Sequence, residues 1–190
     1  KNNLKRVDVS NLPELVYFDL RFNALTDIKV SDCPKMQIIA VGDNNIASIE
    51  LKGLPELYTL GCYSNTLSSL DLSNLPKLEI LECYNNNLVS LNLSANPLLT
   101  TLTCQNNMIS DLNISSCTSL SKFDCSSNRL SGTLDMSAYK NLKSFACGGN
   151  KFTSINIDGC TLITEISCDN TDITAINVSG AVNLQSFICN

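Results

Sequence analysis

The chain has 190 residues, 44% of them hydrophobic, and a formal net charge of −5. This acidic balance argues against nucleic acid and anionic membrane surfaces as partners, because both attract basic proteins. No apolar run approaches the ~18 residues that cross a bilayer, and the chain lacks histidine, the usual general base in Ser and Cys nucleophile systems. We therefore predict no membrane insertion, no nucleic-acid binding and no enzymatic activity.

A cysteine recurs at nearly constant spacing and divides the chain into repeats. Val41 and Leu20 hold the same position in two earlier repeats, so the position favours a small buried hydrophobic residue. Such a period predicts a solenoid, whose function must be sought on an extended surface. The spacings are 21, 21, 21, 22, 21 and 21 residues for Cys62, Cys83, Cys104, Cys125, Cys147, Cys168 and Cys189.

Each repeat opens with the pattern LxxLxC, in which apolar and variable residues alternate. This period of two predicts a strand whose leucines and cysteine point inward. The predicted strands open at Leu15, Met36, Leu57, Leu78, Leu99, Leu120, Leu142, Ile163 and Leu184.

An asparagine follows each predicted strand, where the chain must turn sharply. Its amide can satisfy buried backbone groups that no strand ladder reaches. We predict this role for Asn23, Asn44, Asn65, Asn86, Asn107, Asn128 and Asn150, with Thr171 replacing asparagine once.

The second half of each repeat, LxxLDLSxLP, predicts extended or turn-like structure. About 21 residues leave too little chain for a strand, a turn and a helix of ~11 residues. The single 22-residue repeat has its extra residue near Ser131-Gly132-Thr133, where glycine can absorb a bulge. Rigid bends are predicted at Pro34, Pro55, Pro76 and Pro97.

The pattern LxxLxCxxNxL resembles the leucine-rich-repeat signature, and the 21-residue form with LDLSxLP resembles the short bacterial class called the IRREKO type. The clearest copy, residues 57–79, reads LYTLGCYSNTLSSLDLSNLPKLE. Departures include Thr171 for asparagine and phenylalanine for leucine at positions 145 and 152. The resemblance implies a curved right-handed solenoid with a concave parallel β-sheet of about nine strands. Its convex side is expected to be extended or turn-like, with little helix.

We expect one leucine-rich-repeat domain spanning residues 1–190. Both ends stop inside a repeat, at Lys1 and at Asn190, without a capping sequence of different character. Solenoids normally need caps to cover the exposed edge of the core. The chain is therefore expected to be part of a longer protein, or to have its ends covered by neighbouring molecules.

The ten cysteines are predicted to be free structural thiols. Those of one column sit on successive strands ~4.8 Å apart, whereas a disulfide needs Cβ atoms ~3.8 Å apart. Cys33, Cys117 and Cys160 share a second position with Leu12, Leu54 and Leu75. With no CxxC pair and no histidine, the sequence predicts no metal site and no cofactor.

The residues between the inward leucines and cysteines should face outward on the concave sheet. Small residues there, such as Thr103, are expected to be exposed. Tyrosine is a good contact residue for proteins and sugars, although it is also simply a strong strand former. The main candidate group is Tyr63, Tyr84, Ile80 and Glu82, with Gly61 leaving a shallow gap, and the second is Tyr17, Asp19, Arg21 and Phe22.

These features predict a non-enzymatic recognition module that binds a protein or glycan partner through its concave face. The family resemblance implies a bacterial extracytoplasmic protein, either on the cell surface or secreted. One alternative is a stiff structural spacer that carries an adhesive or catalytic domain outside this chain. Another is an intracellular scaffold, because free thiols are typical of reducing compartments.

Overall fold

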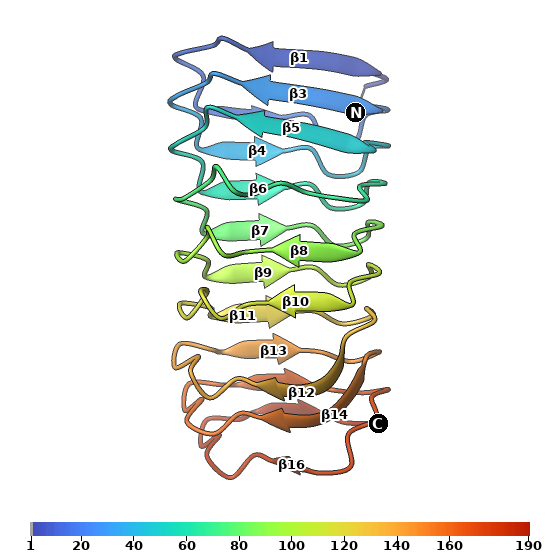
Figure 1. Cartoon of the computed structure of the whole chain (residues 1–190), viewed down its shortest axis with the longest axis vertical. Coiled ribbons are helices and arrows are strands. Elements are labelled where there is room, and N and C mark those ends of the chain that lie inside the picture. Colours follow the sequence, from blue (N-terminus) through green and yellow to red (C-terminus); the bar gives the residue numbers. More distant parts are fainter. Residues whose placement is uncertain (1) are drawn as a thin grey trace.

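The computed structural model describes residues 2–190, which form a solenoid without helix (Figure 1). Every repeat contributes one strand to a parallel nine-stranded sheet, called the long sheet below. It corresponds to the predicted concave sheet, and the predicted fold class is confirmed. Its strands are β2 (Tyr17–Asp19), β4 (Ile38–Ala40), β6 (Thr59–Gly61), β7 (Ile80–Glu82), β9 (Thr101–Thr103), β11 (Lys122–Asp124), β13 (Ser144–Ala146), β15 (Glu165–Ser167) and β17 (Ser186–Ile188).

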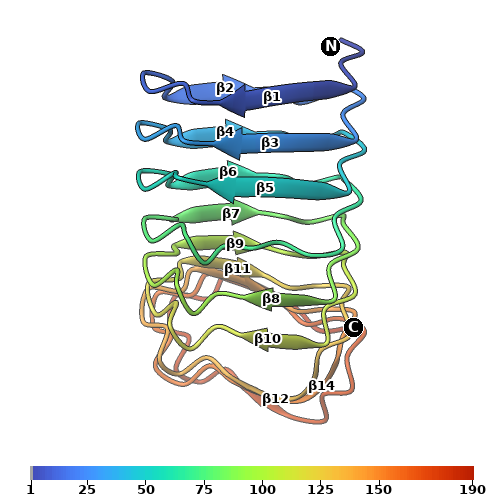
Figure 2. The same ribbon diagram turned by 45° about the horizontal axis from the view of Figure 1, so that its top comes forward.

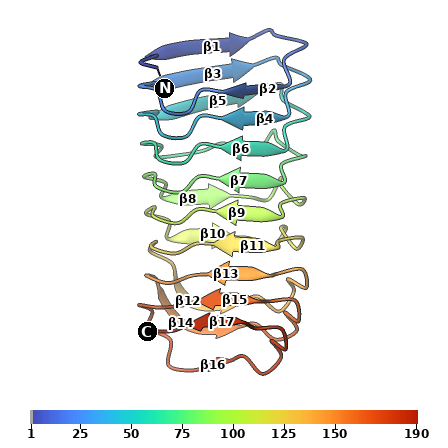
Figure 3. The ribbon, with the colours of Figure 1, turned by 180° about the vertical axis from the view of Figure 1, so that it is seen from behind.

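The opposite side carries three shorter parallel sheets rather than one (Figures 1 and 3). The described residues 62–79, between β6 and β7, contain no strand. The predicted extended side with little helix is thus confirmed. The three sheets are β1 (Arg6–Ser10), β3 (Asp27–Ser31) and β5 (Ser48–Lys52); β8 (Ser90–Asn92) and β10 (Asp111–Asn113); and β12 (Ser131–Asp135), β14 (Lys151–Asn156) and β16 (Ile176–Asn177).

The core lies between the long sheet and the opposite side. In β7, Leu81 is buried while Ile80 and Glu82 are half-buried on the other face, as the period-two pattern predicts. Leu60 and Leu102 lie beside Leu81 in register and are equally buried. Burial of one such leucine stabilises the fold by roughly 1.5–3 kcal/mol, so columns of leucine supply most of the driving force.

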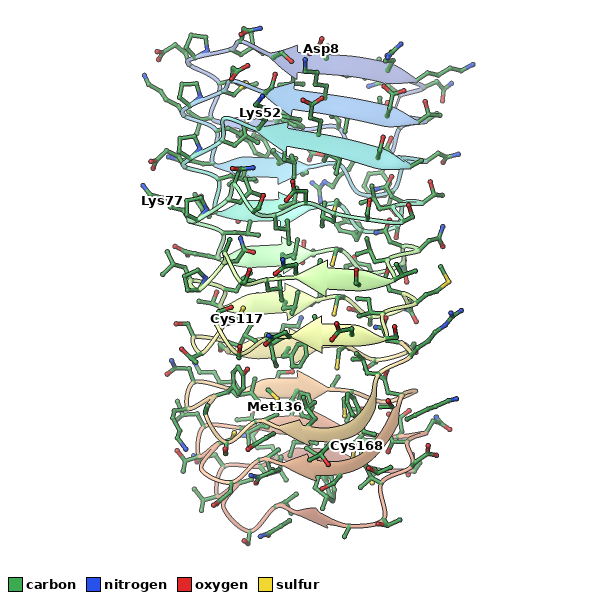
Figure 4. The ribbon with its side chains drawn as sticks, in the orientation of Figure 1. Asp8, Lys52, Lys77, Cys117, Met136 and Cys168 are labelled. Atoms are coloured by element: carbon green, nitrogen blue, oxygen red, sulfur yellow. The ribbon has the colours of Figure 1, made fainter. Side chains whose placement is uncertain are left out.

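All ten cysteines are free and nine are buried, which confirms the predicted ladder. Burial raises the pKa of the Cys62 thiol to about 12, because an apolar interior disfavours the thiolate. In the second column the Cys160 thiol donates to the Met136 carbonyl oxygen at 3.1 Å. Figure 4 labels Cys168 and Cys117, one thiol from each column.

Each turn asparagine ties two consecutive repeats together. The Asn86 amide nitrogen donates to the carbonyl oxygens of Cys83 at 3.1 Å and Tyr84 at 3.2 Å in its own repeat. It also donates to Cys62 in the preceding repeat at 3.1 Å, and its side-chain oxygen accepts from the Leu67 amide at 3.0 Å. The predicted role is therefore confirmed. It also extends to the neighbouring repeat, which the sequence did not indicate.

The residue before each turn asparagine adopts a left-handed backbone conformation. Glycine, asparagine and aspartate tolerate this region best, and they hold five of these positions, while serine holds two. Phe22 is the exception, because a bulky side chain is strained there. The φ angles are 58° for Phe22, 54° for Asp43, 50° for Ser64, 54° for Asn85, 56° for Asn106, 53° for Ser127, 65° for Gly149 and 52° for Asn170.

The LDLSxLP segment builds two kinds of turn. The Met36 amide donates to the Cys33 carbonyl at 3.0 Å, which places Pro34 at the second position of a β-turn, where its restricted φ fits. The predicted proline bend is thus confirmed. The Asp71 carboxylate accepts from the Ser73 amide at 3.0 Å, so the aspartate of LDLS closes an Asx-turn.

We expect Asn86→Ala to lower the free energy of unfolding by about 1–3 kcal/mol, because the Leu67 amide and the Cys62 and Cys83 carbonyl oxygens lose their partner. Urea denaturation measures the effect. Asn87→Ala is the matched control, since its side chain is exposed in the same turn. Equal midpoints for the two variants would contradict the bridging role.

A thiol titration tests the cysteine ladder. Without reductant, denatured protein should react at all ten cysteines, whereas folded protein should react mainly at the exposed Cys189. Recovery of clearly fewer thiols from denatured protein would mean that disulfides form.

Candidate functional site

Two tyrosines stack on the outer face of the long sheet. Tyr63 follows β6 and Tyr84 follows β7, each two residues beyond the last residue of its strand. Their ring centroids lie 4.7 Å apart and the rings are nearly parallel, at 4°. The predicted neighbours therefore form one rigid aromatic surface, and both side chains stay partly accessible.

Gly42 allows this arrangement. A β-carbon at Gly42 would lie 2.5 Å from two atoms of the Tyr63 ring, closer than any side chain permits. The ring thus lies directly on the glycine backbone of the preceding repeat. Sequence reasoning missed Gly42, although its place beside Tyr63 in the same outward row was visible in the pattern.

Gly61 has a different role from the predicted one. A β-carbon there would be 3.6 Å from the Glu82 carboxylate and 3.7 Å from the Tyr63 ring. Gly61 itself is buried. The expected shallow gap beside Gly61 is therefore covered by these two longer side chains.

An ion pair lies at the amino-terminal side of the stacked rings. The Arg21 guanidinium binds the Asp19 carboxylate through two hydrogen bonds, of 2.9 Å and 2.6 Å. The Tyr17 hydroxyl donates to the same carboxylate at 3.2 Å. Donation by Arg21, aided by Tyr17, holds the pKa of Asp19 well below its usual range, so this carboxylate stays charged.

The structure joins the two predicted candidate groups into one surface. The pKa of Arg21 is raised, first by its hydrogen bonds to Asp19 and then by the adjacent Tyr63 hydroxyl. The Tyr63 ring leans over Gly42, which lies one repeat from Arg21, so the ion pair and the aromatic pair are neighbours on this face. We call Tyr17, Asp19, Arg21, Tyr63 and Tyr84 the tyrosine–arginine patch.

The other predicted residues border this patch. Ile80 and Glu82 lie on β7, half-buried. Burial raises the pKa of Tyr84, with smaller contributions from Tyr63 and Glu82. Phe22 is 50% exposed beside Arg21 and offers a further aromatic contact.

Beyond Tyr84, the prediction that Thr103 is exposed is wrong. Thr103 is 4% exposed, because its small side chain lies among longer neighbours on the sheet. Glu82 is its partner in register on one side and Asp124 on the other. The Thr103 hydroxyl oxygen and the Gln105 side-chain oxygen are buried without a hydrogen-bond partner.

No group of three or more Cys, Asp or Glu side chains in residues 2–190 is arranged to hold a metal ion. The described part of the chain also has no helix suited to crossing a membrane. The patch can offer aromatic stacking, hydroxyl hydrogen bonds and one paired charge.

The geometry defines a leucine-rich-repeat solenoid, and solved bacterial structures share it. The functional domain of InlJ from Listeria monocytogenes, described as including a cysteine ladder, is similar at 26% identity with a TM-score of 0.77. That match covers 98% of this chain and 51% of the InlJ chain. The shared cysteine ladder agrees with the free thiol columns here.

Two further structures share the fold at lower identity. The leucine-rich-repeat protein LIC12759 of Leptospira interrogans is 19% identical with a TM-score of 0.77, covering 94% of this chain and 55% of that one. YopM from Yersinia enterocolitica WA-314 is 20% identical with a TM-score of 0.78, covering 98% and 41%. The predicted resemblance to bacterial leucine-rich-repeat proteins is thus confirmed, and the chain spans about half the length of these structures.

Neither protein-family models nor curated proteins match the chain.

We expect Gly42→Ala to displace the Tyr63 ring and break its stacking on Tyr84, because the new methyl group occupies the place of the ring. Near-ultraviolet circular dichroism should change in the tyrosine band. Gly61→Ala is the matched control, since its added β-carbon meets only ordinary contacts at 3.6 Å or more. An unchanged spectrum for Gly42→Ala would contradict the packing of Tyr63 on Gly42.

Proposed function

We propose that this domain is a non-enzymatic recognition module that binds a protein or glycan partner through the outer face of the long sheet, at the tyrosine–arginine patch. The observation that carries the proposal is the stacked pair of Tyr63 and Tyr84, with the Arg21–Asp19 ion pair on the same face. The leucine-rich-repeat fold, with its long open sheet, supports an interaction module.

The patch has the physical properties of a binding hot spot. Tyrosine offers a large apolar ring and a hydroxyl, and it loses little conformational entropy on binding. Here the rings are already ordered by stacking and by Gly42, so a partner would not have to order them. The flat faces of the rings suit a sugar ring or an aromatic or aliphatic side chain.

The proposed setting is a bacterial surface or secreted protein. The similarity to the InlJ functional domain supports this setting. We also propose that residues 1–190 form a single domain belonging to a longer protein. The free thiols leave an intracellular scaffold as an alternative.

A structural spacer is the second candidate function. The long sheet runs without a break from β2 to β17, and such a continuous ladder makes a stiff rod. In that case the binding or catalytic domain lies elsewhere in the protein, and the patch is ordinary sheet surface.

The test is the double variant Tyr63→Ala with Tyr84→Ala. After a ligand is selected from glycan and surface-protein panels, the double variant should lose about 2 kcal/mol or more of binding free energy, roughly thirtyfold in Kd. The circular dichroism spectrum and urea midpoint show whether the fold is retained. Surface plasmon resonance measures the affinity.

Lys52→Ala is the control variant, because Lys52 is exposed at the end of β5 on the opposite side (Figure 4). It should bind as the parent does. A ligand that binds the double variant as tightly as the parent would place recognition elsewhere and favour the spacer.

A further inference from the structure

On the side opposite the long sheet, the pairing of strands is interrupted between β10 and β12. Within residues 2–190, β10 pairs only with β8, and β12 pairs with β14 on its other side. In Figures 1 and 2, β12 curves away from β10. The long sheet stays continuous at the same level, since β11 pairs with both β9 and β13. The interruption therefore affects one side of the solenoid only.

The 22-residue repeat between Cys125 and Cys147 lies at this interruption, whereas the other interruption, between β5 and β8, lies in repeats of 21 residues. The pairing of β12 with β14 shifts register between Gly132 and Thr133, at the predicted position, and the residue left unpaired is Thr153 on β14. Gly132 has φ +82° and an added β-carbon would meet nothing within 4 Å, so this position projects into open space. The extra residue lets β12 move outward from its neighbour.

On each side of the interruption, a hydrogen bond connects the two neighbouring repeats. At one end the Arg129 amide donates to the Ile109 carbonyl oxygen at 2.8 Å. At the other end the Tyr139 hydroxyl donates to the Ile114 carbonyl oxygen at 2.8 Å, and Tyr139 is 4% exposed. The opening is thus a bounded part of the folded structure.

The interruption leaves a cavity of about 160 Å³ between β10 and β12. Buried apolar side chains form its base, and exposed Ser110, Asp111, Ser131 and Thr133 form its mouth. The buried base consists of Ile114, Phe123, Cys125, Leu130 and Phe152, with half-buried Leu112 and Leu134 at its sides.

We propose that this cavity is a binding site for a small hydrophobic molecule the size of one aromatic ring, carrying a hydrogen-bond donor at its exposed end. An apolar cavity of roughly 150 Å³ in another protein stays free of water and takes up benzene. The cavity here has a similar volume, and its base has a similar lining of leucine, isoleucine and phenylalanine, whereas its polar mouth opens to solvent. Water gains few hydrogen bonds at such a base, so an apolar ring fills it better.

The mouth selects the polar end of the ligand. The Asp111 carboxylate accepts hydrogen bonds, and the hydroxyls of Ser131 and Thr133 can accept or donate. A phenol is therefore a better ligand than a plain hydrocarbon of similar size. This site lies opposite the tyrosine–arginine patch and does not depend on the proposed function.

The experiment titrates the intact protein with p-cresol and with toluene and follows the methyl groups by NMR. Saturable shifts should appear at Leu112, Ile114 and Leu134, with a Kd on the order of 1 mM or below for a ligand of this size. p-Cresol should bind several-fold more tightly than toluene. The thermal midpoint should rise with ligand concentration, because the ligand binds only the folded state.

Two variants test the location. Leu112→Phe should fill part of the cavity and weaken p-cresol binding at least tenfold, and deletion of Gly132 should do the same by restoring the 21-residue spacing. Val89→Phe, at an exposed position one repeat away, is the control and should bind as the parent does.

The proposal fails if neither ligand gives saturable shifts at these methyl groups in the parent. It also fails if folded Leu112→Phe protein binds p-cresol as the parent does. Should the deletion variant not fold, Leu112→Phe and the parent still decide the outcome. Equal affinity for toluene and p-cresol would overturn the role given to the polar mouth.

Discussion

The buried turn asparagine is the interaction on which this solenoid depends. A repeat of 21 residues must reverse direction sharply after a three-residue strand, and the turn leaves peptide groups inside that no strand partner reaches. Asn86 satisfies such groups in two repeats at once, and its counterparts repeat the arrangement along the stack. Because each amide spans a repeat boundary, it also aligns the leucine and cysteine columns that form the core.

Much of the fold was predictable because the same evidence occurs about nine times. Alternation in one copy of LxxLxC would be ambiguous, but the repeated copies predict strands, inward thiols and turn asparagines together. The left-handed residue before each asparagine was not predicted, since Asp43, Ser64 and Asn85 meet the same backbone demand with different side chains. The Asx-turn at Asp71 was missed, although aspartate or asparagine recurs at that position and either side chain can close such a turn.

For the candidate site, the sequence predicted which residues are neighbours on the sheet but not how their side chains pack. Period two places Tyr63 and Tyr84 side by side, and they are neighbours in the structure. Their stacking depends on the missing β-carbon of Gly42, and the approach of Arg21 depends on side-chain conformation, which a repeat pattern does not contain. The burial of Thr103 was missed for a related reason, because exposure depends on the length of neighbouring side chains.

The single longer repeat shows how such an array accommodates a change of period. Across it, Phe123 still pairs with Phe145 and Asp124 with Ala146, so the long sheet keeps its phase. The change in register is confined to β12 and its neighbours, on the side opposite the long sheet. A residue added there therefore leaves the outward rows of the long sheet aligned. One face of the molecule is free to vary in length, and the other retains its spacing.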